Sequence, residues 1–102
     1  MSRVVEINNF NEHEAFINNN SRGVLFFGSM SCPHCHDMVQ FVNDLSVKYP
    51  NVKFGPIEVS KVDVDNVDGV PVFVGYKSRQ PVDVVLGARK NALEDMVKNK
   101  LS

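Results

Sequence analysis

The chain has 102 residues, of which 43% are hydrophobic and 23% are charged, and its formal net charge is -1. This length suits one domain, residues 1–102, and the composition is that of a folded globular protein rather than a disordered segment. The small net charge gives no electrostatic basis for binding nucleic acid. Because there is neither an apolar run of about eighteen residues nor an N-terminal signal pattern, we expect a cytoplasmic protein without a membrane partner.

The first quarter of the chain predicts a strand, a helix and a second strand. Residues 4–7 form a short apolar strand pattern, and residues 12–19 form an amphipathic helical pattern that ends in a polar, asparagine-rich run. Residues 24–27 are all apolar and are flanked by Gly23 and Gly28. A short apolar run without alternation predicts a strand that is covered on both faces.

The middle of the chain predicts a long helix and another strand. Apolar residues recur at spacings of three and four over residues 32–49, which is the pattern of one buried helix face. Residues 52–60 predict a strand, and we expect Gly55 and Pro56 to disturb its middle. Residues 62–69 contain three aspartates and predict an acidic loop.

The last third predicts a hairpin and a closing helix. Residues 71–76 and 82–86 are β-branched runs, and the five residues 77–81 between them suit a hairpin connection. Residues 90–101 predict an amphipathic helix with an apolar stripe. This alternation of elements predicts an α/β fold, a three-layer α/β/α sandwich with a central mixed sheet.

The only two cysteines, Cys32 and Cys35, enclose Pro33 and His34 and are followed by His36. Such a motif fits a redox pair, two zinc ligands or the attachment of a c-type haem. Haem attachment requires export, for which no signal is visible, and structural zinc requires four ligands. We therefore favour redox chemistry, with no metal and no cofactor.

The placement of the motif favours a reactive thiolate. Cys32 falls where a central strand leads into a helix, which is where open α/β sheets place their sites. Pro33 suits the first helical position, where its missing N–H costs nothing. The free N–H groups of the first turn and the helix dipole stabilise negative charge at Cys32.

These pieces together resemble the thioredoxin superfamily over nearly the whole chain. The resemblance is carried by residues 24–28 before the motif, by the motif itself, by Gly69-Val70-Pro71 downstream and by Gly87-Ala88 before the last helix. It implies the thioredoxin fold and a thiol-disulfide oxidoreductase. It also implies a cis peptide bond before Pro71. The dipeptide Pro33-His34 is similar to that of the bacterial periplasmic disulfide oxidases.

The chain also departs from the thioredoxin pattern. Ser31 and Gly28 stand where thioredoxins usually have tryptophan, and Gln40 replaces a helix-kinking proline. Phe26 stands where thioredoxins have a buried aspartate that assists proton removal, and the lysine partner of that aspartate falls near Pro56. We therefore expect slow deprotonation of Cys35, or deprotonation by another group.

Thiolate chemistry assigns the roles of the two cysteines. Cys32 is the expected nucleophile and Cys35 the resolving thiol, while Pro33 and His34 tune the thiolate. The substrate groove is expected to involve five residues, namely Met30, Ser31, Val70, Pro71 and Gly87. The backbone of Val70 would accept an extended substrate segment as an added strand.

The resemblance implies protein disulfides as substrates and a monomeric enzyme. Its electron donor would be a thioredoxin reductase or glutathione. Two other functions remain open: a glutaredoxin-like, glutathione-coupled reductase, and a redox-sensing or partner-docking module without turnover. A disulfide-reduction assay separates the enzymes from the module, because a docking module need not turn over.

Overall fold

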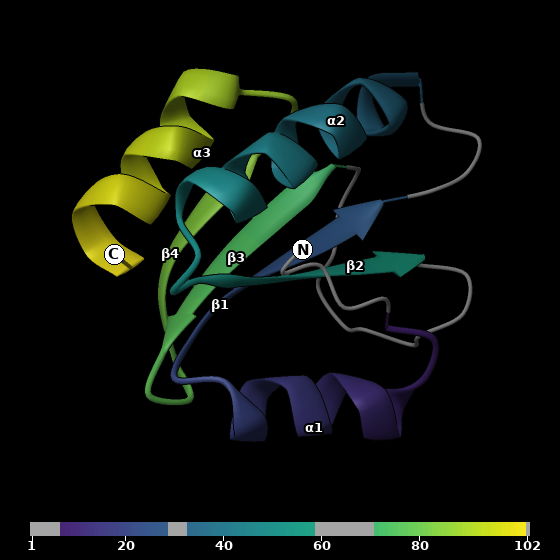
Figure 1. Cartoon of the computed structure of the whole chain (residues 1–102). Coiled ribbons are helices and arrows are strands. Elements are labelled where there is room, and N and C mark those ends of the chain that lie inside the picture. The colour runs from purple at the N-terminus through teal and green to yellow at the C-terminus, as the bar shows by residue number, and fades with distance from the viewer. Residues whose placement is uncertain (1–6, 29–32, 59–70, 102) are drawn as a thin grey trace.

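The central feature of the computed structural model is a mixed β-sheet (Figure 1). The structure describes residues 7–28, 33–58 and 71–101. The strands of the sheet are β1 (Arg22–Gly28), β2 (Lys53–Glu58), β3 (Val72–Lys77) and β4 (Gln80–Leu86). Among the described residues their order is β2-β1-β3-β4. The β1–β2 pair is parallel and the other two pairs are antiparallel, so the predicted mixed sheet is confirmed.

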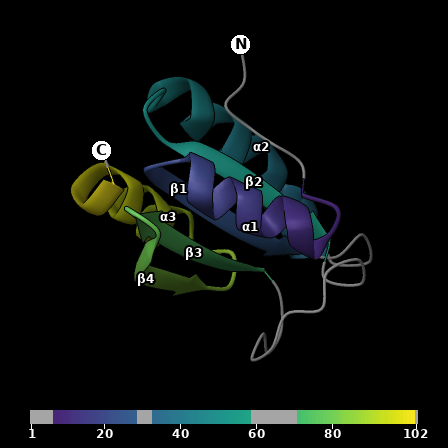
Figure 2. The same cartoon turned by 90° about the horizontal axis from the view of Figure 1, so that it is seen from below.

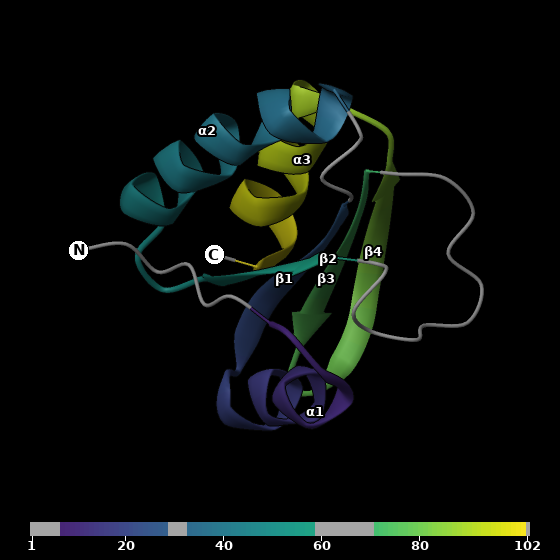
Figure 3. The same cartoon turned by 90° about the vertical axis from the view of Figure 1, so that its right-hand side faces the viewer.

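Helices cover both faces of this sheet, as Figure 3 shows most directly. The helical elements are α1 (Phe10–Asn19), α2 (Pro33–Lys48), α3 (Lys90–Met96) and the π-helical turn η1 (Val97–Leu101). The face opposite α1 carries α2, α3 and η1. In the view from below, α1 lies over β1 and β2, and β3 and β4 extend beyond it (Figure 2). This arrangement confirms the predicted three-layer α/β/α sandwich.

Strand β1 is the centre of two hydrophobic clusters, one on each face of the sheet. Val24 and Phe26 belong to the cluster beneath α2 and α3, whereas Leu25 and Phe27 belong to the cluster beneath α1. All four side chains are at most 4% exposed. The apolar run therefore forms a strand covered on both faces, as predicted.

Strand β2 corrects the expectation that Gly55 and Pro56 disturb its middle. It pairs with β1 in one unbroken parallel register, with Pro56 opposite Phe26. The carbonyl of Pro56 accepts a hydrogen bond from the Ile7 N–H at 3.0 Å, so the backbone of Pro56 faces away from β1. Because its missing N–H would point to the same side, proline costs β2 no bond to β1.

Of the predicted strand 4–7, only Ile7 is described, and it forms a parallel bridge with Ile57.

The β3–β4 hairpin is tighter than predicted. Its strands extend to Lys77 and Gln80, which leaves a two-residue turn instead of a five-residue connection. Ser78 and Arg79 have φ angles of 53° and 69°. Two left-handed residues in succession form the mirror-image turn whose twist matches a hairpin, although asparagine and glycine are its usual residues. A hydrogen bond from the Ser78 N–H to the Ser21 carbonyl, 2.8 Å long, holds the turn in place.

The helices begin and end close to their predicted limits. Helix α1 starts two residues earlier than expected because Asn9 caps it by accepting the Glu12 N–H, while Glu12 accepts the Asn8 N–H. The closing helix is regular as far as Met96 and then widens into η1. Its predicted stripe is confirmed as buried, namely Leu93, Met96, Val97 and Leu101.

Candidate active site

Cys35 lies in the first turn of α2, against the end of β1. Its side chain is only 4% exposed, whereas Pro33 and His34 beside it are exposed. A Cβ atom at Gly28 would lie 3.4 Å from both the Cβ and the Sγ of Cys35. The side chain of Cys35 therefore lies over the carboxyl end of the strand, within van der Waals distance of a Cβ position at Gly28. Sequence reasoning treated Gly28 only as a lost tryptophan and missed this contact.

An aromatic pair forms the apolar floor beside this cysteine. The rings of Phe26 and Phe73 are stacked, with centroids 4.7 Å apart and an interplanar angle of 22°. Phe26 is 4% exposed and Phe73 is fully buried, and both belong to the same cluster as Cys35. The predicted core position of Phe26 is thus confirmed, and an aromatic ring occupies the place where thioredoxins carry a carboxylate.

Pro71 and Gly87 lie at the same end of the sheet. Phe27 pairs with Val72 at the end of the β1–β3 ladder, and Gly28 and Pro71 are the chain neighbours of this pair. The buried Pro71 uses its carbonyl to accept the Gly87 N–H at 2.8 Å. Gly87 has a φ of 85°, a conformation that glycine adopts without strain. Two of the predicted groove residues are therefore joined to each other by a backbone hydrogen bond.

The remaining predicted site residues fall outside the described part of the chain. They are Met30, Ser31, Cys32 and Val70. The predicted cis bond before Pro71 involves Val70 and lies outside it as well. Cys35 takes part in a disulfide, and the only other cysteine in the sequence is Cys32.

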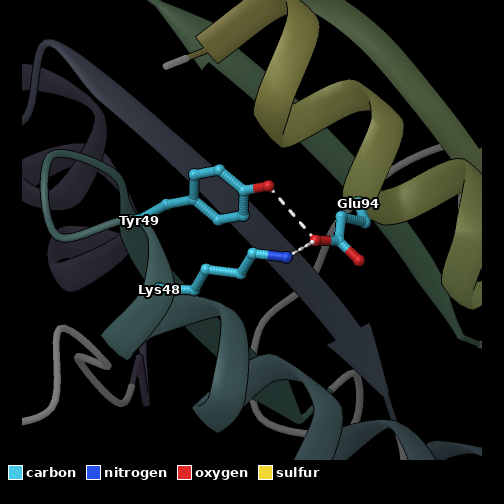
Figure 4. Close-up of polar contacts among 3 residues, drawn as sticks. All are labelled: Lys48, Tyr49 and Glu94. Atoms are coloured by element: carbon cyan, nitrogen blue, oxygen red, sulfur yellow. Dashed lines mark hydrogen bonds and ion pairs between the residues drawn. The ribbon is translucent and has the colours of Figure 1, made fainter.

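A polar cluster joins the far end of α2 to α3 and was not predicted (Figure 4). The Glu94 carboxylate accepts hydrogen bonds from the Lys48 ammonium and from the Tyr49 hydroxyl, the latter at 3.1 Å. The bond from Lys48 is the main reason that the pKa of Glu94 is lowered, and the same bond raises the pKa of Lys48. Because the partners are 45 and 46 residues apart, no local pattern could have indicated the cluster. It lies more than three helical turns from Cys35 and braces the two helices.

The described residues contain neither a metal-binding cluster nor a membrane-spanning helix. In that part of the chain no three histidine, cysteine, aspartate or glutamate side chains lie close enough together to hold a metal ion. No helix there is long and apolar enough to cross a bilayer.

The fold and the cysteine position together define a class of protein. A mixed sheet between helical layers, with a buried cysteine in the first turn of the helix that follows a central strand, is the architecture of the thioredoxin fold. The thioredoxin family model matches residues 3–99. The chain belongs to the thioredoxin family, and it is a thioredoxin-like disulfide oxidoreductase.

Individual relatives agree with this assignment. The chain is 32% identical to the thioredoxin Asp f 28 of Aspergillus fumigatus over 102 residues, which cover 95% of this chain and 94% of the relative. The crystal structure of the thioredoxin NaTrxh from Nicotiana alata matches with a TM-score of 0.90 and 28% identity, over 99% of this chain and 95% of that chain. The oxidized mitochondrial thioredoxin 3 of Saccharomyces cerevisiae matches with a TM-score of 0.88 and 28% identity, over 94% of both chains.

Proposed function

We propose that the chain exchanges protein disulfides through a reversible disulfide between Cys32 and Cys35. The observation that supports this most directly is the buried Cys35 in the first turn of α2, against Gly28. A buried thiol at this position is shielded from external disulfides. This environment suits a resolving thiol and leaves Cys32 as the cysteine that meets the substrate.

The proposed reaction has two exchange steps. The Cys32 thiolate attacks one sulfur of a substrate disulfide, which forms a mixed disulfide and releases the first substrate thiolate. The Cys35 thiolate then attacks the Cys32 sulfur, which forms the internal disulfide and releases the second substrate thiolate. The substrate gains two electrons and the cysteine pair loses two. The reverse sequence oxidises a dithiol.

The substrate would lie across the end of the sheet where Pro71 meets Gly28. We assign the groove to Met30, Ser31, Val70, Pro71 and Gly87. The hydrogen bond between Pro71 and Gly87 supports this assignment, since it holds two groove residues together at that end. An extended substrate segment would pair with the backbone of Val70.

We further propose a single-domain, monomeric, cytoplasmic enzyme over residues 1–102. Its electron donor would be a thioredoxin reductase, as for other members of the family, or glutathione. The thioredoxin family match over residues 3–99 supports the first donor more than the glutaredoxin-like alternative. Turnover of a protein disulfide with a thioredoxin reductase, but not with glutathione alone, would support the reductase as the electron donor.

The roles of the cysteines are tested by trapping. Cys35→Ser should accumulate mixed disulfides with a disulfide-containing protein substrate, because the second step is blocked. Cys32→Ser should trap nothing and should abolish disulfide reduction. Trapping by Cys32→Ser instead would reverse the assignment. A wild-type protein that binds substrates without reducing them would favour the docking module.

The redox poise depends on His34 in this proposal. A positive charge beside Cys32 stabilises the thiolate, and hence the reduced form, which makes the disulfide more oxidising. We expect a reduction potential above the roughly -270 mV of an ordinary thioredoxin. His34→Gly should make the pair more reducing, as measured by equilibration with glutathione. An unchanged potential in this variant would show that His34 does not set the poise.

A further inference from the structure

The second exchange step needs a proton acceptor that Phe26 cannot provide. Cys35 must lose its proton before it attacks, because the thiolate is the nucleophile. Burial in an apolar cluster disfavours the charged thiolate. A carboxylate near the sulfur would offset that cost by taking the proton. The strand register identifies which carboxylate lies on the correct side of the sheet.

Glu58 is the last residue of β2, and it pairs with Gly28. Side chains alternate between the two faces along a strand. Phe54 belongs to the cluster beneath α2 and α3, and Ile57 belongs to the cluster beneath α1. The side chain of Glu58 is therefore on the same face of the sheet as that of Phe54. Cys35 packs against this face.

Gly28 lies between Glu58 and Cys35 and is a neighbour of both. Paired strands lie about 4.8 Å apart, so the backbones of Gly28 and Glu58 are direct neighbours. Cys35 lies over the same face of Gly28, because a Cβ atom built on this glycine would lie 3.4 Å from the cysteine sulfur. With no side chain at Gly28 between them, a glutamate can approach the sulfur directly or through one water molecule. Glu58 is partly buried, so water reaches it.

We propose that Glu58 is the general base that takes the proton of Cys35 during release of the mixed disulfide. This inference rests on the proposed roles of the two cysteines. The carboxylate accepts the thiol proton as the Cys35 sulfur bonds to the Cys32 sulfur. The Cys32–substrate bond breaks, and its electron pair leaves with the substrate thiolate. Glu58 then returns its proton to water.

Among the described residues, the titratable side chains on the first turns of α2 are exposed to solvent. The first turns of α2 carry His34, His36 and Asp37, all exposed, whereas Cys35 and Met38 face the sheet. Strand β1 has no titratable side chain between Gly23 and Gly28. Glu58 is thus the carboxylate that the described strands place on the cysteine's side of the sheet at this end.

The test separates the two steps with one probe. Reduced protein is mixed with a symmetrical aromatic disulfide, the dithiobis-nitrobenzoate reagent, in a stopped-flow spectrometer. Attack by Cys32 releases the first coloured thiolate, and attack by Cys35 releases the second. Glu58→Gln should slow the second release by about 10- to 100-fold near pH 7 and leave the first release unchanged. The deficit should shrink towards pH 10, where hydroxide can remove the thiol proton.

Matched variants complete the experiment. Glu94→Gln makes the same charge change on α3, away from the cysteine, and should leave both releases unchanged. Glu58→Asp keeps a carboxylate and should restore the second release to within a few-fold of the wild-type rate. If Glu58→Gln slows neither release, or slows both equally, Glu58 is not the base, and the proposed function still stands. If Cys32→Ser leaves the first release unchanged, the proposed function itself fails.

Discussion

The two faces of the sheet differ in how completely they are covered. The face beneath α2 and α3 carries the larger hydrophobic cluster of the described residues, which includes Cys35. The face beneath α1 carries a smaller cluster centred on Phe16 and β1. Strand β4 extends beyond α1 (Figure 2). Its Val84 and Leu86 side chains are 49% and 63% exposed. Cys35, the proposed resolving cysteine, thus lies on the face with the larger cluster.

This difference shows how packing and chemistry are combined in this fold. A resolving thiol has to be held at a fixed distance from its partner, and a close-packed apolar floor provides that rigidity. The outer strand β4 has no such task and is protected differently. There the Val84 N–H donates to the Asp83 carboxylate at 2.9 Å, and Lys100 pairs with the same carboxylate at 3.1 Å. A backbone donor of β4 is therefore satisfied within the chain. Charged side chains commonly prevent an edge strand from pairing with another chain.

The largest expected effect comes from removing the floor of the site. Phe73→Ala deletes a fully buried ring that stacks on Phe26. We expect the free energy of unfolding to fall by about 3–5 kcal/mol, from the lost burial and the cavity left behind. Urea denaturation followed by circular dichroism measures this loss. A loss below about 1 kcal/mol would show that the floor is not closely packed.

Neighbouring valines on β4 sharpen the comparison, because they face opposite sides of the sheet. Val85 is 5% exposed and belongs to the larger cluster, whereas Val84 is 49% exposed. Val85→Ala should lower the free energy of unfolding by about 1–3 kcal/mol, since it removes two buried methyl groups. Val84→Ala should change it by less than about 0.5 kcal/mol. Equal losses in the two variants would contradict the difference in coverage.

Two glycines test how each face tolerates added volume. A Cβ atom at Gly55 would lie 2.6 Å from Cδ1 of Ile7 and 3.1 Å from the rigid ring of Phe16, beneath α1. A Cβ atom at Gly75 would lie 2.9 Å from the flexible side chain of Met96, beneath α3. Gly55→Ala should therefore cost about 1–2 kcal/mol of stability, and Gly75→Ala should cost less, because methionine adapts its shape. Thermal denaturation of both variants decides the order, and the reverse order would refute it.

The smallest effect is expected at the exposed cluster that braces α2 and α3. Glu94→Gln removes the charge that pairs with Lys48, so we expect a small decrease in Tm near neutral pH. The pKa of Glu94 is lowered from 4.5, so its contribution is present above pH 4.5 and is lost as the pH falls through the lowered value. The pKa of Lys48 is raised from 10.5, so its contribution is complete below pH 10.5 and is lost as the pH rises through the raised value.

A series of Tm measurements across pH checks this prediction. The difference in Tm between the wild type and Glu94→Gln should be constant between pH 4.5 and pH 10.5 and should disappear in acid. A difference in Tm that persists in acid, below the lowered pKa of Glu94, would mean that packing rather than charge produces it.

The sequence by itself determined the order of the elements, the sandwich and the class of chemistry. These features depend on local patterns: apolar runs for β1, three- and four-residue spacing for α2, and two cysteines at the start of a helix after a strand. The hairpin turn was predicted too long because Ser78 and Arg79 are not typical left-handed residues. Their conformation comes from the pairing of the flanking strands, not from their own preference.

Only the tertiary structure decided which distant residues meet at the site. Strand register sets Glu58 beside Gly28 and Val72 beside Phe27, and the packing of α2 sets Cys35 over the same glycine. The brace between Tyr49 and Glu94 likewise joins residues 45 positions apart. Periodicity reports which face of an element is buried, but it does not report which residue of another element lies opposite. Register and side-chain packing fix those partners, and they exist only once the whole chain has folded.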